Sequence, residues 1–229
     1  MDKRLQKCAE LCVGDRAADI GTDHGYLPCY LVESGICSSA LACDIAEKPL
    51  ESARTHIARS GLEDRVTALL SDGLRSVPLE GVTDVIIAGM GGELIVSILE
   101  NCPAVAQGRL RPNLVLQPMT KWDVLRRWLC ENGFEVIREL PCEEGRFVYS
   151  VMQAVYTGRI TKDPGLEYLY IGKVSPDTPE GREYISRQAK RLETAGRGKL
   201  NSPTEKALGE KMTALSKELS ERLCRSQER

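Results

Sequence analysis

Short aliphatic runs alternate with amphipathic segments along the first two thirds of the chain. The short runs predict strands over residues 16–20, 41–44, 66–70, 84–88 and 113–116. Apolar positions spaced three or four residues apart predict helices over residues 3–12, 47–60, 93–100 and 121–132. This alternation is typical of a parallel sheet whose strands are joined by crossover helices, so we expect an α/β fold.

The last two strand-like runs of this region cover residues 134–139 and 146–156. The segment between them is too short for the crossover of a dozen or more residues that a parallel return needs. We therefore expect a mostly parallel sheet that ends in an antiparallel hairpin.

From residue 159 the composition changes to a charged, proline-punctuated and helix-prone stretch. One helical stripe contains Ile185, Ala189 and Leu192, and a second contains Leu208, Met212, Leu215, Leu219 and Leu223. Residues 196–198 predict a turn between the two helices, and residues 202–205 resemble a capping box at the start of the second. We expect a main domain over residues 1–158 and a coiled-coil-like helical hairpin over residues 159–229.

The composition is that of a soluble globular protein, with 42% hydrophobic and 28% charged residues. No apolar run approaches the roughly 18 residues of a membrane span, and the first residues do not resemble a secretory signal, so we expect a cytoplasmic protein. The nine cysteines include no C-x-x-C pair. We expect buried free thiols in a reducing compartment and no metal site.

The net charge of −2 conceals an asymmetry between the two parts. Residues 159–229 contain 15 Lys and Arg against 11 Asp and Glu, whereas residues 1–158 contain 16 against 22. A basic appendage favours contact with phosphates, although a solvated hairpin of mixed charge would have a similar composition. The basic candidates for RNA contact fall into two sets. We expect the first near the ligand site of the main domain: Arg109, Arg111, Lys121, Arg126 and Arg127. The second lies on the appendage: Arg187, Lys190, Arg191, Arg197 and Lys199.

The first predicted strand leads into an acidic, glycine-containing turn. This turn resembles the methyltransferase signature D-x-G-x-G-x-G, with Asp23 in place of the middle glycine, and it lacks the G-x-G-x-x-G pattern of dinucleotide-binding proteins. Glycine lets the backbone approach a ligand closely, and a strand-to-helix turn presents free amide donors. We expect the amino-acid end of a cofactor to contact Asp19, Gly21, Thr22, Asp23, Gly25 and Tyr26.

Two further acids follow the second and third predicted strands. Asp44 lies 25 residues after Asp19, where an acid in Rossmann-like sheets accepts hydrogen bonds from ribose hydroxyls. Asp72, followed by Gly73, lies where an acid in methyltransferase-type sites accepts a hydrogen bond from the amino group of adenine. Because ligands bind at the carboxyl edge of such sheets, three acids at three successive strand ends indicate one nucleoside site.

The fourth predicted strand ends in glycines around Gly89 and Met90. Methyltransferases that modify exocyclic amines often have an (N/D)-P-P-(Y/F) element here, and this chain does not. The glycines expose backbone carbonyls and leave room for a flat base, so Gly89 and Met90 are further candidates for the site, although a plain tight turn before a helix is the alternative.

Taken together, residues 19–28, 72–74, 87–92 and 116–118 resemble the TrmK family of bacterial tRNA adenine-N1 methyltransferases that modify adenine 22. The resemblance covers residues 1–157 and, more loosely, the helical tail. It implies a Rossmann-like class I methyltransferase domain, a C-terminal coiled-coil domain, S-adenosylmethionine as cofactor and tRNA as partner. The chain departs from the family at Met119, where Asn is common, and at Asp44, where Glu is common.

Methylation at N1 of adenine places few chemical demands on the protein. N1 already has a lone pair, so the enzyme must chiefly orient it toward the methyl group. The product carries positive charge, for which we expect Asp23 and the carbonyls around Gly89 to provide acceptors, with His24 and Gln117 contacting the base. A paired adenine would first have to leave the helix.

Two other functions fit the same residues. A methyltransferase for a small molecule or a protein would share the cofactor site, and a non-catalytic nucleotide-binding module would share the fold. The sequence leaves the oligomeric state open.

Overall fold

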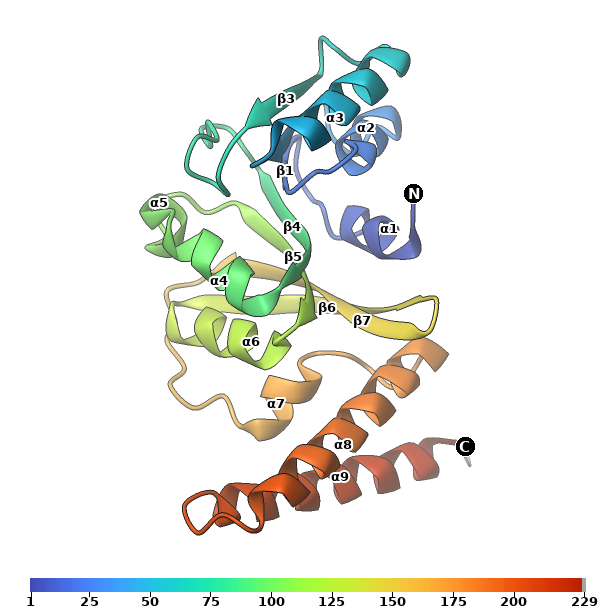
Figure 1. Cartoon of the computed structure of the whole chain (residues 1–229), viewed down its shortest axis with the longest axis vertical. Coiled ribbons are helices and arrows are strands. Elements are labelled where there is room, and N and C mark those ends of the chain that lie inside the picture. The colour runs from blue at the N-terminus through green and yellow to red at the C-terminus, as the bar shows by residue number, and fades with distance from the viewer. Residues whose placement is uncertain (228–229) are drawn as a thin grey trace.

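A seven-stranded sheet with helices on both faces forms the centre of the molecule (Figure 1). The computed structural model describes residues 1–227. The strand order is β3-β2-β1-β4-β5-β7-β6, and the first five are parallel to one another. The strands are β1 (Arg16–Ile20), β2 (Ser39–Asp44), β3 (Val66–Leu70), β4 (Asp84–Gly91), β5 (Asn113–Thr120), β6 (Phe134–Glu144) and β7 (Phe147–Tyr156).

The structure confirms the predicted α/β fold and its antiparallel ending. β7 pairs antiparallel with both β5 and β6, so the β6–β7 hairpin completes the sheet. β4 and β5 each extend beyond the predicted strands, to Gly91 and Thr120, with shifts of register at Met90. These shifts bend the strand ends at the edge where a ligand would bind.

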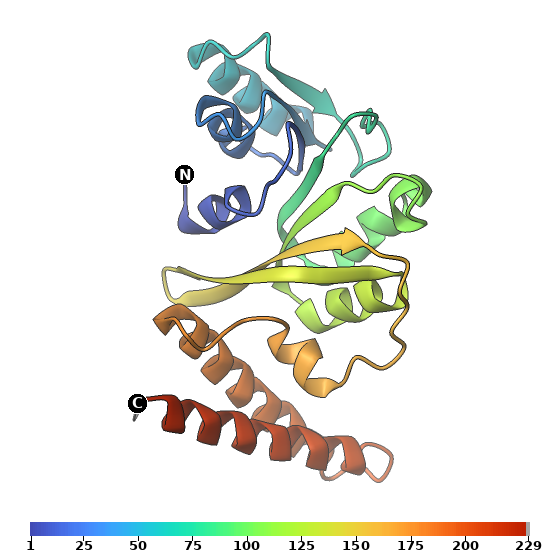
Figure 2. The same ribbon diagram turned by 180° about the vertical axis from the view of Figure 1, so that it is seen from behind.

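The strands are apolar on both faces because helices cover both faces (Figures 1 and 2). Ile86 and Val115 pack toward one layer, and Ile87 and Leu116 toward the other. The first layer consists of α1 (Lys3–Ala9), α2 (Tyr26–Glu33) and α3 (Glu47–Arg59). The second consists of α4 (Gly92–Glu100), α5 (Pro103–Ala106) and α6 (Trp122–Glu131).

The spacing of apolar and polar residues did not predict the bounds of α2, because this short helix has too few polar residues to show a helical period. Its eight residues are mostly apolar, and five of them are buried. An all-apolar segment this short gives no helical period. α2 is nevertheless the helix that follows the glycine turn, and Gly25 at its N-cap has φ +71°.

The C-terminal region folds as the predicted helical hairpin, beside the β6–β7 end of the sheet (Figures 1 and 2). It contains α7 (Leu166–Ile171), α8 (Pro179–Lys199) and α9 (Lys206–Gln227). None of the helices within residues 1–227 is long and apolar enough to cross a membrane.

Two details of the predicted hairpin were wrong. Gly196 lies inside α8 and not in the turn. Glycine is needed there because α8 and α9 approach closely: a Cβ atom on Gly196 would lie 2.9 Å from the carbonyl oxygen of Gly209. The capping box is also absent: α9 begins at Lys206, the Ser202 hydroxyl lies 3.2 Å from that of Thr204, and Glu205 pairs with Lys199.

Arg126, predicted to contact RNA, is instead completely buried between the sheet and the C-terminal helices. Its guanidinium donates to Glu139 on β6, to the Leu169 carbonyl (2.8 Å) and to the Tyr184 hydroxyl (2.9 Å). A buried cation needs such partners to offset its lost hydration. This cluster joins α6, β6, α7 and α8, and therefore fixes how the hairpin sits against the sheet.

Candidate functional site

The predicted site residues gather at the carboxyl edge of the sheet, around β1 and β4. These two strands are neighbours in the sheet although β2 and β3 lie between them in sequence. In open α/β sheets, ligands bind in the crevice at such a switch point, where the connections on either side run in opposite directions.

The acidic, glycine-containing turn after β1 is held in place by β2. The amides of Gly21 and Thr22 donate to the Cys43 carbonyl at 2.8 and 2.9 Å. Gly21 has φ +79°, and a Cβ atom there would lie 2.3 Å from the Met90 methyl carbon. The positive φ favours glycine at this position, and the absence of a side chain lets the turn lie directly against Met90 at the end of β4.

Asp19 is a buried carboxylate at the end of β1, with 5% of its surface exposed. Burial raises its pKa from the ordinary 3.8 to about 6, while Thr22 and Arg4 act in the opposite direction. The Thr22 hydroxyl lies near enough to influence Asp19, yet it is buried and makes no well-formed hydrogen bond in the described chain. A buried carboxylate beside an unpartnered hydroxyl is suited to a ligand that carries an ammonium group.

The other two acids lie at the same edge. Asp44 receives hydrogen bonds from the backbone amides of Ala46 (3.0 Å) and Asp23 (3.4 Å), so it ties the glycine turn to β2. Asp72 lies one strand further and forms an ion pair with Arg75 at 2.8 Å. Gly73 follows it with φ +58°. The arrangement brings the three predicted acids to three adjacent strands, β1, β2 and β3.

On the other side of the crevice, Gln117 holds the turn around Gly89. Its side-chain oxygen accepts a hydrogen bond from the Gly89 backbone N–H at 3.0 Å, and its side-chain nitrogen donates one to the Pro118 carbonyl at 3.1 Å. Gln117 is fully buried. Its amide is therefore already engaged within the chain, and the Gly89 N–H is one of its partners.

Arg4 is a residue of this site that the sequence did not indicate. Its guanidinium donates to the Gln117 oxygen at 3.0 Å, pairs with Asp2 at 3.1 Å, and lies 2.9 Å from where a Gly89 Cβ would be. Arg4 comes from α1, which reaches the site across one face of the sheet. No local pattern could predict it, because the contact depends only on how α1 packs.

His24 lies on the other side of the glycine turn. Its ring is exposed, 3.5 Å from the Asp23 carboxylate, and its centroid is 5.4 Å from that of Tyr26. Tyr26 in turn meets His56 of α3 edge-on at 4.9 Å. No hydrogen bond or ring contact between described residues joins His24 to Gly89 or Gln117.

The basic candidates separate into two groups. Arg109 and Arg111 precede β5 and so lie at the opposite edge of the sheet from the crevice, where Arg111 stacks on Tyr156; their expected place near the site was wrong. On α8, Arg187 pairs with Glu183. Arg191 has no ion-pair partner among the described residues and lies over the Trp122 ring, 4.5 Å from its centroid.

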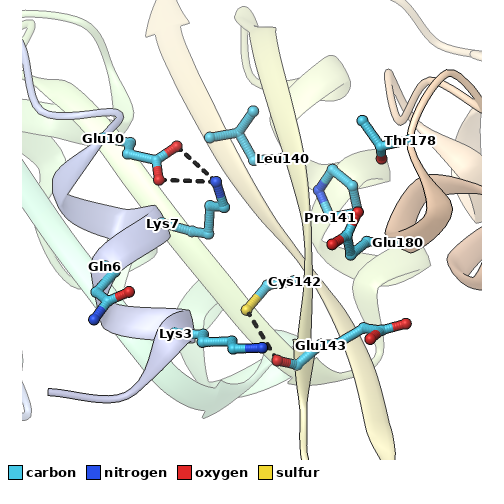
Figure 3. Close-up of a pocket in the computed structure, with 10 residues that line it drawn as sticks. All are labelled: Lys3, Gln6, Lys7, Glu10, Leu140, Pro141, Cys142, Glu143, Thr178 and Glu180. Atoms are coloured by element: carbon cyan, nitrogen blue, oxygen red, sulfur yellow. Dashed lines mark hydrogen bonds and ion pairs between the residues drawn. The ribbon is translucent and has the colours of Figure 1, made fainter.

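Another hollow, of about 350 Å³, lies between α1 and β6 (Figure 3). Its charged groups are already paired in part, because Lys7 and Glu10 bind each other at 2.8 Å. In the described part of the chain no group of three or more His, Cys, Asp or Glu residues could hold a metal ion. The nine cysteines are free thiols.

Comparisons with known proteins point to one family. A family model described as a methyltransferase domain matches residues 1–152. The tRNA (adenine(22)-N(1))-methyltransferase of Bacillus subtilis is 38% identical over 155 residues, which are 67% of this chain. The matched region spans only 64% of that enzyme's length.

Solved structures match along nearly the whole chain. The B. subtilis m1A22 tRNA methyltransferase TrmK is 28% identical with a TM-score of 0.75, over 97% of this chain and 95% of that one. A candidate tRNA (m1A22) methyltransferase of Streptococcus pneumoniae, in complex with S-adenosyl-L-methionine, is 30% identical with a TM-score of 0.78, over 96% and 99%. The chain belongs to the methyltransferase domain family and, within it, to the TrmK family of tRNA (adenine-22-N1) methyltransferases.

Proposed function

We propose that this chain is a cytoplasmic, S-adenosylmethionine-dependent tRNA methyltransferase that transfers a methyl group to N1 of adenine 22. One observation carries the proposal: the glycine turn after β1 and the Gly89 turn after β4 meet across the switch point, where Gly21, at φ +79°, lies directly against the Met90 side chain. The family relationship supports the same activity.

The residues of the crevice fit this cofactor. The Asp19 carboxylate and the unpartnered Thr22 hydroxyl are suited to its amino-acid end, Asp44 to the ribose hydroxyls and Asp72 to the adenine amino group. We therefore assign cofactor binding to Asp19, Gly21, Thr22, Asp23, Gly25, Tyr26, Asp44, Asp72, Gly73, Gly89 and Met90.

S-adenosylmethionine supplies an electrophilic methyl group on its sulfonium. What this chain must add is orientation of the target base and stabilisation of the charge that adenine acquires. Gln117 fixes the Gly89 peptide through its amide, so the neighbouring carbonyls are oriented in advance to accept the adenine amino hydrogens. We propose Gln117 as a positioning residue, acting together with Arg4.

Asp23 and His24 have a different place in the proposal. The Asp23 carboxylate is 70% exposed at the crevice mouth, where its negative charge favours a positively charged product. The His24 ring, beside it, is exposed and could contact the target base of the incoming RNA. Neither residue needs to act as a general base, because N1 of adenine is already unprotonated.

We also propose that residues 1–158 bind the cofactor and residues 159–229 help to hold the RNA. The Arg126 cluster supports this division, because it fixes α8 beside the carboxyl edge of β5, where α8 would form one wall of a groove for RNA. An incoming tRNA could contact both parts at once.

Methyl transfer to matched transcripts tests the proposal. With labelled cofactor, an unmodified tRNA transcript with adenine at position 22 should accept label, and the same transcript with guanine 22 should accept none. Equal labelling of both transcripts would refute the assigned nucleotide. Labelling of proteins or small molecules only would favour the rival methyltransferase, and cofactor binding without any turnover would favour the non-catalytic module.

A further inference from the structure

A small hollow lies where the end of β5 meets the start of β7 and the middle of α8. It measures about 250 Å³. We call it the β5–α8 hollow, and its lining includes Trp122, Phe147, Tyr149, Gln188 and Arg191. It begins directly after Gln117, the residue that holds the Gly89 turn. The hollow and the methyl-transfer crevice therefore share one rim of the sheet.

Gln188, on α8, points to a ligand for this hollow. The side chain is 0% exposed, and neither its amide nitrogen nor its amide oxygen has a hydrogen-bond partner in the described chain. Buried amides are nearly always paired, because losing water without a replacement partner is costly. A ligand that offers one acceptor and one donor side by side would satisfy both groups.

The rest of the lining suits a flat, negatively charged partner. Trp122, Tyr149 and Phe147 provide ring surfaces, and rings of this kind stack on nucleobases of any sequence. Arg191 stacks on Trp122 without a carboxylate partner among the described residues, so its charge is available to a phosphate. The hollow is smaller than the roughly 300–1,000 Å³ of sites for drug-sized ligands, which favours a single base.

We propose that the β5–α8 hollow binds an unpaired adenine next to the methylated one, with Gln188 hydrogen-bonding to the base edge and Arg191 contacting a phosphate. Adenine fits because a glutamine amide forms two hydrogen bonds to its amino group and neighbouring ring nitrogen. A neighbouring base is favoured over the target itself because the crevice lies between β1 and β4, and the hollow lies beyond β5. This inference rests on the proposed function.

The test uses the full chain and ligated tRNA transcripts that carry either adenine or purine, which lacks the amino group, at each nucleotide flanking adenine 22. Affinity is measured by fluorescence anisotropy, and KM and kcat by methyl transfer. The wild type should prefer adenine at one flanking position by about tenfold, as expected for one two-bond base contact. Gln188→Leu should lose that preference through KM while keeping kcat and cofactor affinity.

Two further variants make the result specific. Ser186→Ala, on the same helix but outside the hollow, should retain the preference. Arg191→Gln should weaken binding of every transcript while the preference remains. Gln188→Leu should keep or raise the midpoint of urea unfolding, since it removes an unpartnered buried amide.

The inference is overturned if Gln188→Leu keeps the wild-type preference at both flanking positions, or if it weakens all transcripts equally. Anisotropy needs no turnover, so a preference lost in Gln188→Leu supports the hollow even if the protein methylates none of the transcripts. An absence of methylation would refute the proposed function but not the binding of a base in the hollow.

Discussion

Replacing Asp19 by asparagine should make the protein more stable and less able to bind its cofactor. Asparagine has nearly the same shape and keeps an oxygen acceptor, but it removes a charge that burial makes costly. The folded-state pKa of about 6 lies above the ordinary 3.8. The folded protein therefore binds this proton more tightly than the unfolded chain does, and the free energy of unfolding falls as the pH rises from 3.8 to 6.

The size of the effect follows from that pKa difference. One pKa unit corresponds to about 1.4 kcal/mol, so ionised Asp19 lowers the free energy of unfolding by about 3 kcal/mol at pH 7.5 and by about 1 kcal/mol at pH 4.5. Asp19→Asn should gain up to these amounts relative to the wild type. Urea unfolding at both pH values measures the two differences.

The matched control is Asp64→Asn, in an exposed turn before β3. Its free energy of unfolding should stay within about 0.5 kcal/mol of the wild type at both pH values. Titration calorimetry should show that Asp19→Asn binds S-adenosylmethionine about 10- to 100-fold more weakly, because a hydrogen bond to a charged group is worth about 1.5–3 kcal/mol. An Asp19→Asn protein with unchanged stability and unchanged cofactor affinity would refute the reasoning.

Two further substitutions test the crevice and the attachment of the hairpin. Gly21→Ala strains the turn at φ +79° and displaces the Met90 methyl group, which would lie 2.3 Å from the new Cβ atom, so calorimetry should show weaker cofactor binding. Gly35→Ala, with φ +72° and open space around it, should cost only about 1 kcal/mol of stability and leave cofactor affinity unchanged; equal affinities in the two variants would contradict the account. Arg126→Met leaves Glu139 buried without its cation and should lower the free energy of unfolding by about 3–5 kcal/mol. Adding Glu139→Leu should recover much of that loss in urea unfolding, and a double variant no more stable than Arg126→Met would contradict the explanation.

The strands and the edge of the sheet that carries the site could be predicted because the information is local. Apolar runs predicted the strands, and the acids Asp19, Asp44 and Asp72 lie within two residues of the carboxyl ends of three of them. In a parallel sheet these ends must lie at one edge, so sequence order alone brought the three residues together.

Other features could not be predicted because they depend on packing between distant segments. Arg4 reaches Gly89 only through the path of α1 across the sheet. Arg126 has the composition of a surface cation, and only Glu139 and Tyr184, far along the chain, explain its burial. Gly196 resembles a turn residue in sequence, whereas in the structure it allows two helices to touch.

The central claim is that the crevice delivers a methyl group to N1 of an adenine in tRNA. Nucleoside mass spectrometry of unmodified tRNA after incubation with the protein and S-adenosylmethionine tests it most directly. The account predicts 1-methyladenosine, in an amount approaching one per tRNA that carries adenine 22. A tRNA product that carries no added methyl group, or that carries it on another atom or base, would contradict the claim.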